Sequence, residues 1–353
     1  MTGSNAGVGK ELARILYAKH AKVYIAARSA EKAASAISSI KASSPSSKGS
    51  LIFLKLDLAD LTTIKASADE FLSKESKLHV LFNNAGVMRP PRGSVTAQGY
   101  ELQLGVNNIG TFMFTKLLTP TLAQTAASEP KGSVRVVWVS SIGAELMSPS
   151  GGVPIDELDN YQHEKKWEFY LYGISKAGNY LHAAEFARRH GDEGIVSVPL
   201  HPGNLDSELY RTINPMLSAV LRRVVLWPSV YGAYTELFGG LSPEVTMEKS
   251  GSWGKSQCNT VFVGVVLTLM FQLCLGAGSW TSGRTWQMPR RARPRAELAS
   301  GRDSGSGRRS RSSRICDVCG RTMRRSGAYL SIVSRISRTL SVCYIVLVHS
   351  TVN

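Results

Sequence analysis

A tyrosine and a lysine four residues apart, Tyr172 and Lys176, are the pair in this sequence best suited to moving a proton. On a helix, side chains with this spacing share one face. A phenol has a pKa of about 10, so it needs a positive charge nearby, such as an ammonium, to ionise near neutral pH. Ser141 ends the apolar run 133–141. Its hydroxyl could hydrogen-bond the substrate oxygen with which Tyr172 exchanges a proton. The spacing predicts acid–base chemistry at an oxygen atom.

Each of these residues also has a structural interpretation. Tyr172 would then be a buried aromatic residue, Lys176 a surface charge and Ser141 a cap at a strand end, with Ser140 as a competing hydroxyl. For each residue considered alone, the structural interpretation is favoured. The presence of all three residues together favours a catalytic interpretation.

Three glycines, Gly3, Gly7 and Gly9, stand just before an expected helix. Glycine allows a tight turn and lets backbone N–H groups approach a pyrophosphate at the positive end of a helix. The alternative interpretation is a flexible chain end. We favour a dinucleotide-binding loop because matching spacings follow downstream.

Arg28 and Asp57 end the next two expected strands. A dinucleotide fold carries an acid at the first position for the ribose hydroxyls, or an arginine for a 2′-phosphate. Arg28 therefore favours NADP(H) over NAD(H). Asp57 either meets the adenine amino group or caps the following helix.

Apolar runs alternate with helical patterns from residue 10 to about 250. Valine-rich runs of this kind are typical of a parallel sheet covered on both faces. Their alternation with helices predicts an α/β fold with a Rossmann-type doubly wound parallel sheet, in one domain over residues 1–253. The expected strands are 22–28, 51–58, 78–86 and 133–141, and the expected helices are 10–20, 61–74 and about 97–122.

Five motifs in order, TGSNAGVG, NNAG, VNNIG, VSS and YGISK, make residues 2–253 resemble the short-chain dehydrogenase/reductase family. The likeness is greatest to its retinol-dehydrogenase-like, WW-domain-oxidoreductase-like branch. The resemblance implies hydride transfer with a nicotinamide cofactor and without a metal. It makes Tyr172 the acid–base group, Ser141 the partner of the substrate oxygen, and Lys176 and Asn107 the continuation of the proton relay.

The same resemblance assigns the cofactor to residues spread over several motifs. They are Thr2, Gly3, Asn5, Gly7, Val8, Gly9, Arg28, Asp57, Leu58, Asn84, Ala85, Gly86, Tyr172, Lys176, Pro202 and Gly203.

Residues 208–228 are apolar, with pairs of arginines, and resemble the substrate-covering helices of the family. An apolar cover predicts a small lipophilic alcohol or ketone as substrate; a surface amphipathic helix is the competing interpretation. Ser207 offers a hydroxyl close to the Pro202–Gly203 turn.

The family begins with an apolar strand, but only Met1 precedes Thr2 here. Without that central strand the sheet loses backbone partners on both sides. We expect the recorded start to be truncated relative to a functional protein, and a chain starting at Met1 to fold poorly.

Most of the net charge of +16 comes from residues 254–353. Residues 1–253 carry 26 Lys+Arg and 23 Asp+Glu, whereas residues 254–353 carry 16 and 3 and hold all five cysteines. The basic stretch 301–314 is interpreted as a disordered segment, and we expect no nucleic-acid partner. The single Cys316–Cys319 pair predicts no metal site.

The apolar run 261–275 is shorter than the roughly 20 residues that span a bilayer. It is interpreted either as a membrane anchor or, with the rest of 254–353, as translated non-coding sequence. The predicted localisation is cytoplasmic, with membrane association through 261–275 as the alternative.

The sequence thus predicts an NADP(H)-dependent oxidoreductase that interconverts an alcohol and a carbonyl compound. The alternative is a catalytically impaired NADP-binding or membrane-tethered relative from a truncated or misread gene. No oligomeric state is predicted.

Overall fold

The computed structural model describes residues 1–255 apart from 161–165, 211–218, 220 and 224–225. The predicted basic tail, with its apolar run 261–275 and its cysteines, lies outside the described residues from residue 256 onward, whereas its first two residues, Gly254 and Lys255, belong to the sheet. Within the described part of the chain, every helix is too short or too polar to cross a membrane.

The centre of the domain is a parallel sheet built from apolar segments. Its pairs are β1 with β2, and β3-β4-β5-β8 in that order, all of them parallel. Every residue of β4 and β5 is buried, which is typical of strands covered on both faces. The strands are β1 (Lys22–Ala27), β2 (Ser50–Lys55), β3 (Val80–Asn83), β4 (Val134–Val139), β5 (Ile195–His201) and β8 (Gly254–Lys255).

The first three residues join the two parts of the sheet. The backbone N–H of Thr2 donates to Phe82 in β3 at 3.0 Å, while the N–H of Gly3 donates to Ala26 in β1 at 2.8 Å. Ala26 in turn donates to the carbonyl of Met1 at 3.0 Å. Met1, Thr2 and Gly3 therefore lie between β1 and β3, where a preceding strand was predicted; that strand stays a prediction.

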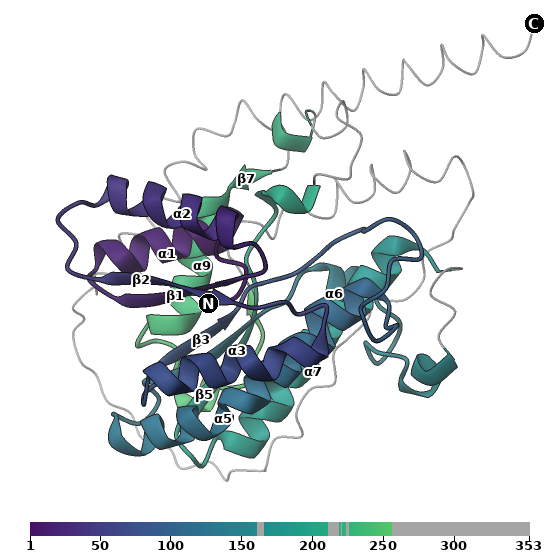
Figure 1. Ribbon diagram of the computed structural model, residues 1–353. Helices are drawn as coiled ribbons and strands as arrows, with labels where there is room; N and C mark the ends of the chain where they lie inside the picture. Colours follow the sequence, from purple (N-terminus) through teal and green to yellow (C-terminus); the bar gives the residue numbers. More distant parts are fainter. Residues whose placement is uncertain (161–165, 211–218, 220, 224–225, 256–353) are drawn as a thin grey trace, which may run out of the picture. The chain divides into compact units, whose positions relative to one another are not determined.

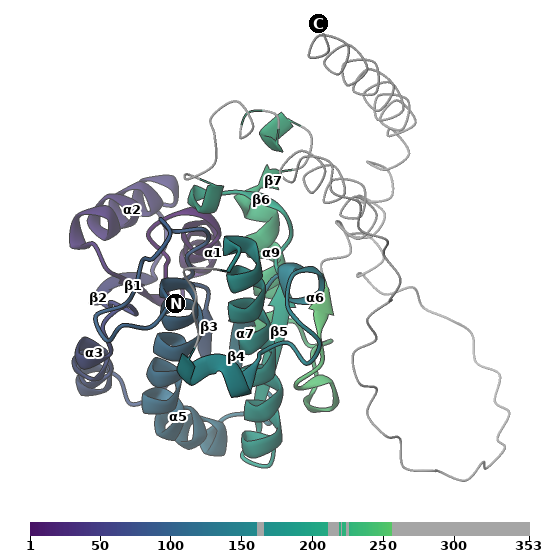
Figure 2. The same cartoon turned by 90° about the vertical axis from the view of Figure 1, so that its right-hand side faces the viewer.

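Helices cover both faces of the sheet, as Figure 1 shows. One face carries α1 (Gly7–Ala18), α2 (Ala30–Ser43) and α9 (Ser229–Leu241); the other carries α3 (Leu61–Lys74), α5 (Thr111–Ser128) and α7 (Glu168–His190). Figure 2 shows α3 beside α5, which it contacts. The Rossmann-type doubly wound fold is confirmed.

Short elements complete the described residues. They are α4 (Leu102–Leu104), the π-helical turn η1 (Gly105–Gly110), α6 (Gly143–Leu146), the 3₁₀ turns η2 (Ile155–Asn160), η4 (Glu208–Tyr210) and η5 (Met247–Lys249), and the paired strands β6 (Leu205–Asp206) and β7 (Trp227–Pro228).

The helix predicted over about 97–122 is present, but its bounds are shifted and it is not uniformly α-helical. The helical segment starts at Leu102 and is interrupted by the π-helical turn before α5. Directly after that turn, the hydroxyl of Thr111 donates to the carbonyl of Val106, five residues back, at 3.0 Å. A Cβ at Gly110 would lie 2.3 Å from the carbonyl oxygen of Leu58, so only glycine allows this close approach.

Trp138 in β4 anchors α7 to the sheet. Its side chain is fully buried, and its indole N–H donates to the hydroxyl of Ser197 in β5 at 3.1 Å. Its ring stacks on His182 of α7, with ring centres 5.8 Å apart. Because α7 carries Tyr172 and Lys176, this contact also positions the predicted chemistry.

We expect Trp138→Ala to lower the free energy of unfolding by about 3–5 kcal/mol, because it removes a buried ring and leaves a cavity. Urea denaturation followed by far-UV circular dichroism measures the change. Phe238→Ala is the control: its side chain is 50% exposed, so we expect a loss of about 1 kcal/mol or less. Equal losses in the two variants would contradict this account of β4.

Candidate active site

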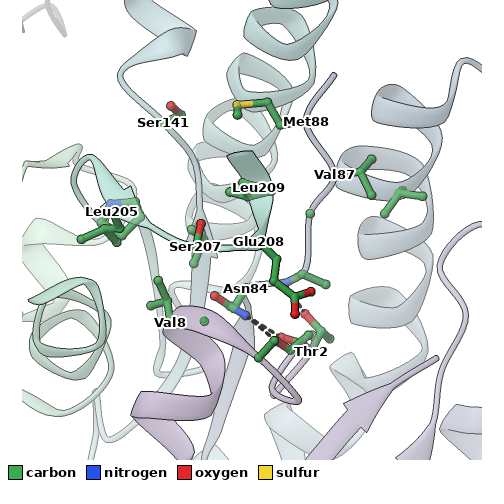
Figure 3. Close-up of a pocket in the computed structure, with 18 of the residues that line it drawn as sticks. Thr2, Val8, Asn84, Val87, Met88, Ser141, Leu205, Ser207, Glu208 and Leu209 are labelled. Carbon is green, nitrogen blue, oxygen red and sulfur yellow. Dashed lines mark hydrogen bonds between the residues drawn. The ribbon is translucent and has the colours of Figure 1, made fainter. Parts of the chain in front are cut away.

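A cleft of about 530 Å³ opens at the carboxyl ends of the parallel strands. This is where doubly wound folds bind their ligands. Figure 3 shows the loop of Thr2 and Val8 on one side of the cleft and the segment of Ser207 to Leu209 facing it.

The glycine loop can exist only without side chains at key positions. Gly3 and Gly7 have φ values of +65° and +52°. A Cβ at Gly9 would lie 2.6 Å from the side-chain nitrogen of Asn84 and 2.7 Å from the carbonyl of Gly3. No side chain caps α1 at Ala6, which leaves the first N–H groups of the helix available to a phosphate.

The loop is fastened to the end of β3. The side-chain amide of Asn84 donates to the carbonyl of Thr2 at 2.9 Å, drawn as a dashed line in Figure 3. The hydroxyl of Thr2 accepts from the N–H of Ala85 at 2.9 Å. Two predicted cofactor motifs, far apart in sequence, therefore form one wall of the cleft.

Arg28 and Asp57 both line the cleft, at the ends of β1 and β2. Asp57 accepts from the N–H of Ala59 at 3.0 Å, whereas Asp60 caps α3 by accepting from Thr62 at 3.0 Å. The interpretation of Asp57 as the helix cap was therefore wrong. Its carboxylate orders the turn and lies at the cleft.

Lys32 also lines the cleft and was missed by the sequence reasoning. It lies in the first turn of α2, whose N-cap Ser29 accepts from the N–H of Lys32 at 3.2 Å. Lys32 could have been predicted from its position. It lies four residues after Arg28, on the helix that follows the same strand.

Tyr172 and Ser141 meet in the same part of the cleft. Tyr172 is 7% exposed, and burial raises the pKa of its phenol to about 12, while a hydrogen bond with Ser141 acts in the opposite direction. Ser141 also accepts from the N–H of Gly143 at 3.1 Å, which fixes its hydroxyl. The sequence predicts a lowered phenol pKa; here the cost of burial dominates.

Lys176 is buried one helical turn after Tyr172. Its ammonium donates to the carbonyl of Val139 at 2.8 Å and lies 5.8 Å from the ring centre of Tyr172. Burial lowers the pKa of Lys176 to about 8, and the charge of Glu236 opposes that shift. The hydroxyl of Ser140, the competitor of Ser141, donates to the backbone carbonyl of Lys176 at 2.6 Å.

Asn107 lies behind the wall of the cleft, in the π-helical turn. Its side chain accepts from the N–H of Val87 at 2.7 Å and donates to the carbonyl of Val87 at 2.9 Å and to Ser175 at 3.0 Å. A Cβ at Gly86 would lie 3.2 Å from the Asn107 oxygen and 3.3 Å from the Lys176 ammonium. Asn107 therefore holds the segment after β3 against α7.

The structure brings together nearly all the residues predicted from the sequence. The lining includes Thr2, Gly3, Asn5, Gly7, Val8, Arg28, Asp57, Leu58, Asn84, Ala85, Gly86, Ser141, Tyr172, Lys176, Pro202 and Gly203. Gly9 and Asn107 are absent from the lining and support it from behind.

Sequence comparison identifies the protein family. Residues 1–153 match the short chain dehydrogenase family. A curated short-chain dehydrogenase/reductase of Phomopsis amygdali is 55% identical over 263 residues, which are 72% of this chain and 78% of that protein. One from Phaeosphaeria nodorum is 49% identical over 259 residues, 72% of this chain and 82% of that protein. The chain belongs to the short-chain dehydrogenase/reductase family.

Solved structures support the same fold. The RhlG/NADP complex of Pseudomonas aeruginosa matches with a TM-score of 0.56 and 22% identity, over 72% of this chain and 92% of the other. The NADPH-bound carbonyl reductase from chicken fatty liver matches with a TM-score of 0.52 and 21% identity, over 72% and 94%. At these identities the likeness concerns the fold.

Family membership makes this protein an oxidoreductase that acts on CH–OH groups with a nicotinamide cofactor. The glycine loop fits such a dinucleotide, because three positions there exclude a side chain by conformation or space. The retinol-dehydrogenase-like branch stays a prediction.

Two residues of the substrate cover, which was predicted from the sequence only as the range 208–228, line the cleft. Glu208 and Tyr210 line the cleft from the turn η4. Burial raises the pKa of Tyr210 above its ordinary value, and the nearby phenol of Tyr172 adds to this. The predicted substrate cover over 208–228 lies partly outside the described residues.

We expect Gly9→Ala to weaken the binding of a nicotinamide cofactor about tenfold or more, because the added methyl would displace the glycine loop. Titration of protein fluorescence with NADPH measures the dissociation constant. Gly99→Ala is the control, since the position has φ +82° but nothing within 4 Å of the new methyl, and we expect its affinity to be unchanged. An unchanged constant in Gly9→Ala would reject the loop assignment.

Proposed function

We propose that this reductase interconverts an alcohol and a carbonyl compound with NADP(H), with Ser141, Tyr172 and Lys176 as its acid–base site. The observation that carries the proposal is the meeting of the three side chains in one cleft with the glycine loop. The bound nicotinamide would supply or accept the hydride.

Tyr172 is the proton donor in carbonyl reduction. With its pKa raised to about 12, the phenol stays protonated at neutral pH, so a proton is available for the oxygen that becomes the alcohol. Ser141 hydrogen-bonds Tyr172 and lies at the same edge of the cleft, so its hydroxyl can also donate to that oxygen.

Lys176 supplies positive charge behind the phenol. Its ammonium is held by the carbonyl of Val139 rather than by a carboxylate at hydrogen-bond distance. A positive charge there stabilises the phenolate that remains after Tyr172 has given up its proton. In alcohol oxidation the same charge favours Tyr172 as the base.

Arg28 and Lys32 favour a cofactor with a 2′-phosphate. Both line the same end of the cleft, at the carboxyl end of β1 and the first turn of α2. Two cations at this place complement a phosphate ester rather than two ribose hydroxyls.

The substrate end of the cleft is apolar, which supports a lipophilic alcohol or ketone. Side chains from five separate segments line it. They are Met88, Met147, Phe169, Leu209 and Leu221.

Replacing Tyr172 by Phe removes the proton donor with little change in shape. We expect kcat for ketone reduction with NADPH to fall by about 10²–10⁴, with the NADPH dissociation constant nearly unchanged. Tyr180→Phe, on the same helix and packed on Trp253, is the matched control and should retain activity. Full activity in Tyr172→Phe would disprove the assignment, and NADPH binding without turnover in the unchanged chain would favour an impaired enzyme.

The cofactor preference is tested by Arg28→Ala and Lys32→Ala. We expect each to raise KM for NADPH about tenfold or more and to leave KM for NADH nearly unchanged, because only the first cofactor carries the 2′-phosphate. Lys10→Ala, which removes a cation outside the cleft lining, should alter neither value. Equal effects on both cofactors would argue against a phosphate contact.

A further inference from the structure

Glu236 is a buried carboxyl group that the proposed mechanism does not use. It lies on α9, on the opposite face of the sheet from α7 (Figure 1). Its side chain is fully buried, and neither carboxylate oxygen has a hydrogen-bond partner among the described residues. A buried carboxyl group without partners is costly, so it calls for a physical explanation.

The surroundings of Glu236 are apolar. Its helical neighbours Ala233 and Leu237 belong to a hydrophobic cluster with Val139 and Leu200, at the carboxyl ends of β4 and β5. Burial in this cluster raises the pKa of Glu236 to about 8. Near neutral pH the carboxyl group is therefore mostly uncharged.

The end of β4 connects Glu236 with Lys176. The side chain of Val139 packs in the cluster beside α9, and its backbone carbonyl receives the Lys176 ammonium at 2.8 Å. The charges of Glu236 and Lys176 act on each other: the carboxylate raises the pKa of Lys176, and the ammonium lowers that of Glu236.

One other group acts electrostatically on Glu236, the amino group of Met1. Burial lowers the pKa of that amino group to about 5, so it is neutral at the pH values where Glu236 titrates. Lys176 is then the charged partner. The other ionisable side chains on elements packed against α9 are Lys10, Glu11, Arg14 and Tyr17 on α1, Arg135 on β4, His201 on β5 and Asp206 on β6.

We propose that Glu236 is a positioning residue for catalysis, whose buried carboxylate keeps the Lys176 ammonium charged from the far side of β4. This inference rests on the proposed function, because it concerns the lysine of that site. Glu236 does not touch the substrate. It acts through Lys176, and its effect grows as the pH rises towards and above 8, where the carboxyl group ionises.

The test is the pH profile of kcat/KM for NADPH-dependent reduction of a hydrophobic ketone, with the full chain and with Glu236→Gln. Without the opposing charge, the pKa of Lys176 falls. We therefore expect the alkaline limb of the kcat/KM profile to shift to lower pH by about 0.5 to 1 pH unit. Below pH 7 the two proteins should agree within about twofold, because Glu236 is uncharged there.

Glu236→Leu controls for packing, since it also removes the charge but adds no hydrogen-bonding group. It should show the same displaced limb as Glu236→Gln. A purely structural role would lower activity by the same factor at every pH, and that result, or an unmoved limb, would overturn the inference.

A double-mutant cycle gives a readout that needs no turnover. The unfolding free energies of the full chain, Glu236→Gln, Lys176→Met and the double variant yield their coupling. We expect the coupling to be clear at pH 8.5 and weak at pH 6; no coupling at pH 8.5 overturns the inference whatever the activity. Coupling in a chain whose Tyr172→Phe variant keeps full activity would refute the proposed function and, with it, the catalytic role of Glu236.

Discussion

The backbone hydrogen bonds of Thr2 and Gly3 are the constraint on which the rest of the site depends. Thr2 donates to Phe82 in β3 and Gly3 donates to Ala26 in β1, so residues 1–3 join strands that do not pair with each other. The same residues open the loop that precedes α1. The position of the glycine loop is therefore set by the two strands beside it, and the side chain of Asn84 secures it from the end of β3.

Burial determines the electrostatics of the cleft. Tyr172 and Lys176 both lie in surroundings that disfavour their charged forms, which raises the pKa of the phenol and lowers that of the ammonium. This arrangement leaves the phenol protonated at neutral pH, as the proposed role of Tyr172 as proton donor requires. It also makes the lysine sensitive to any other buried charge, and Glu236, across the end of β4, becomes such a charge as the pH rises towards 8.

Much of the fold and site could be predicted from sequence because their signals are local. The valine-rich run of β4 and the helical spacing of Tyr172 and Lys176 depend on residues close together in the chain. The π-helical turn around Asn107 was not predicted, and it lies where Gly110 packs closely against Leu58, a residue distant in the sequence. The local pattern of residues does not indicate a contact between segments so far apart in the sequence.

The sequence by itself determined the alternation of strands and helices, the glycine loop and the spacing that makes Tyr172 and Lys176 candidates for acid–base chemistry, since each follows from spacing along the chain. Only the tertiary structure decided that Asp60 and not Asp57 caps α3, that Lys32 joins Arg28 at the cleft, and that Glu236 has no hydrogen-bond partner within the described part of the chain. The physical reason is that burial and charge coupling depend on which elements pack together. The local sequence of α9 does not indicate that the sheet buries the carboxyl group of Glu236.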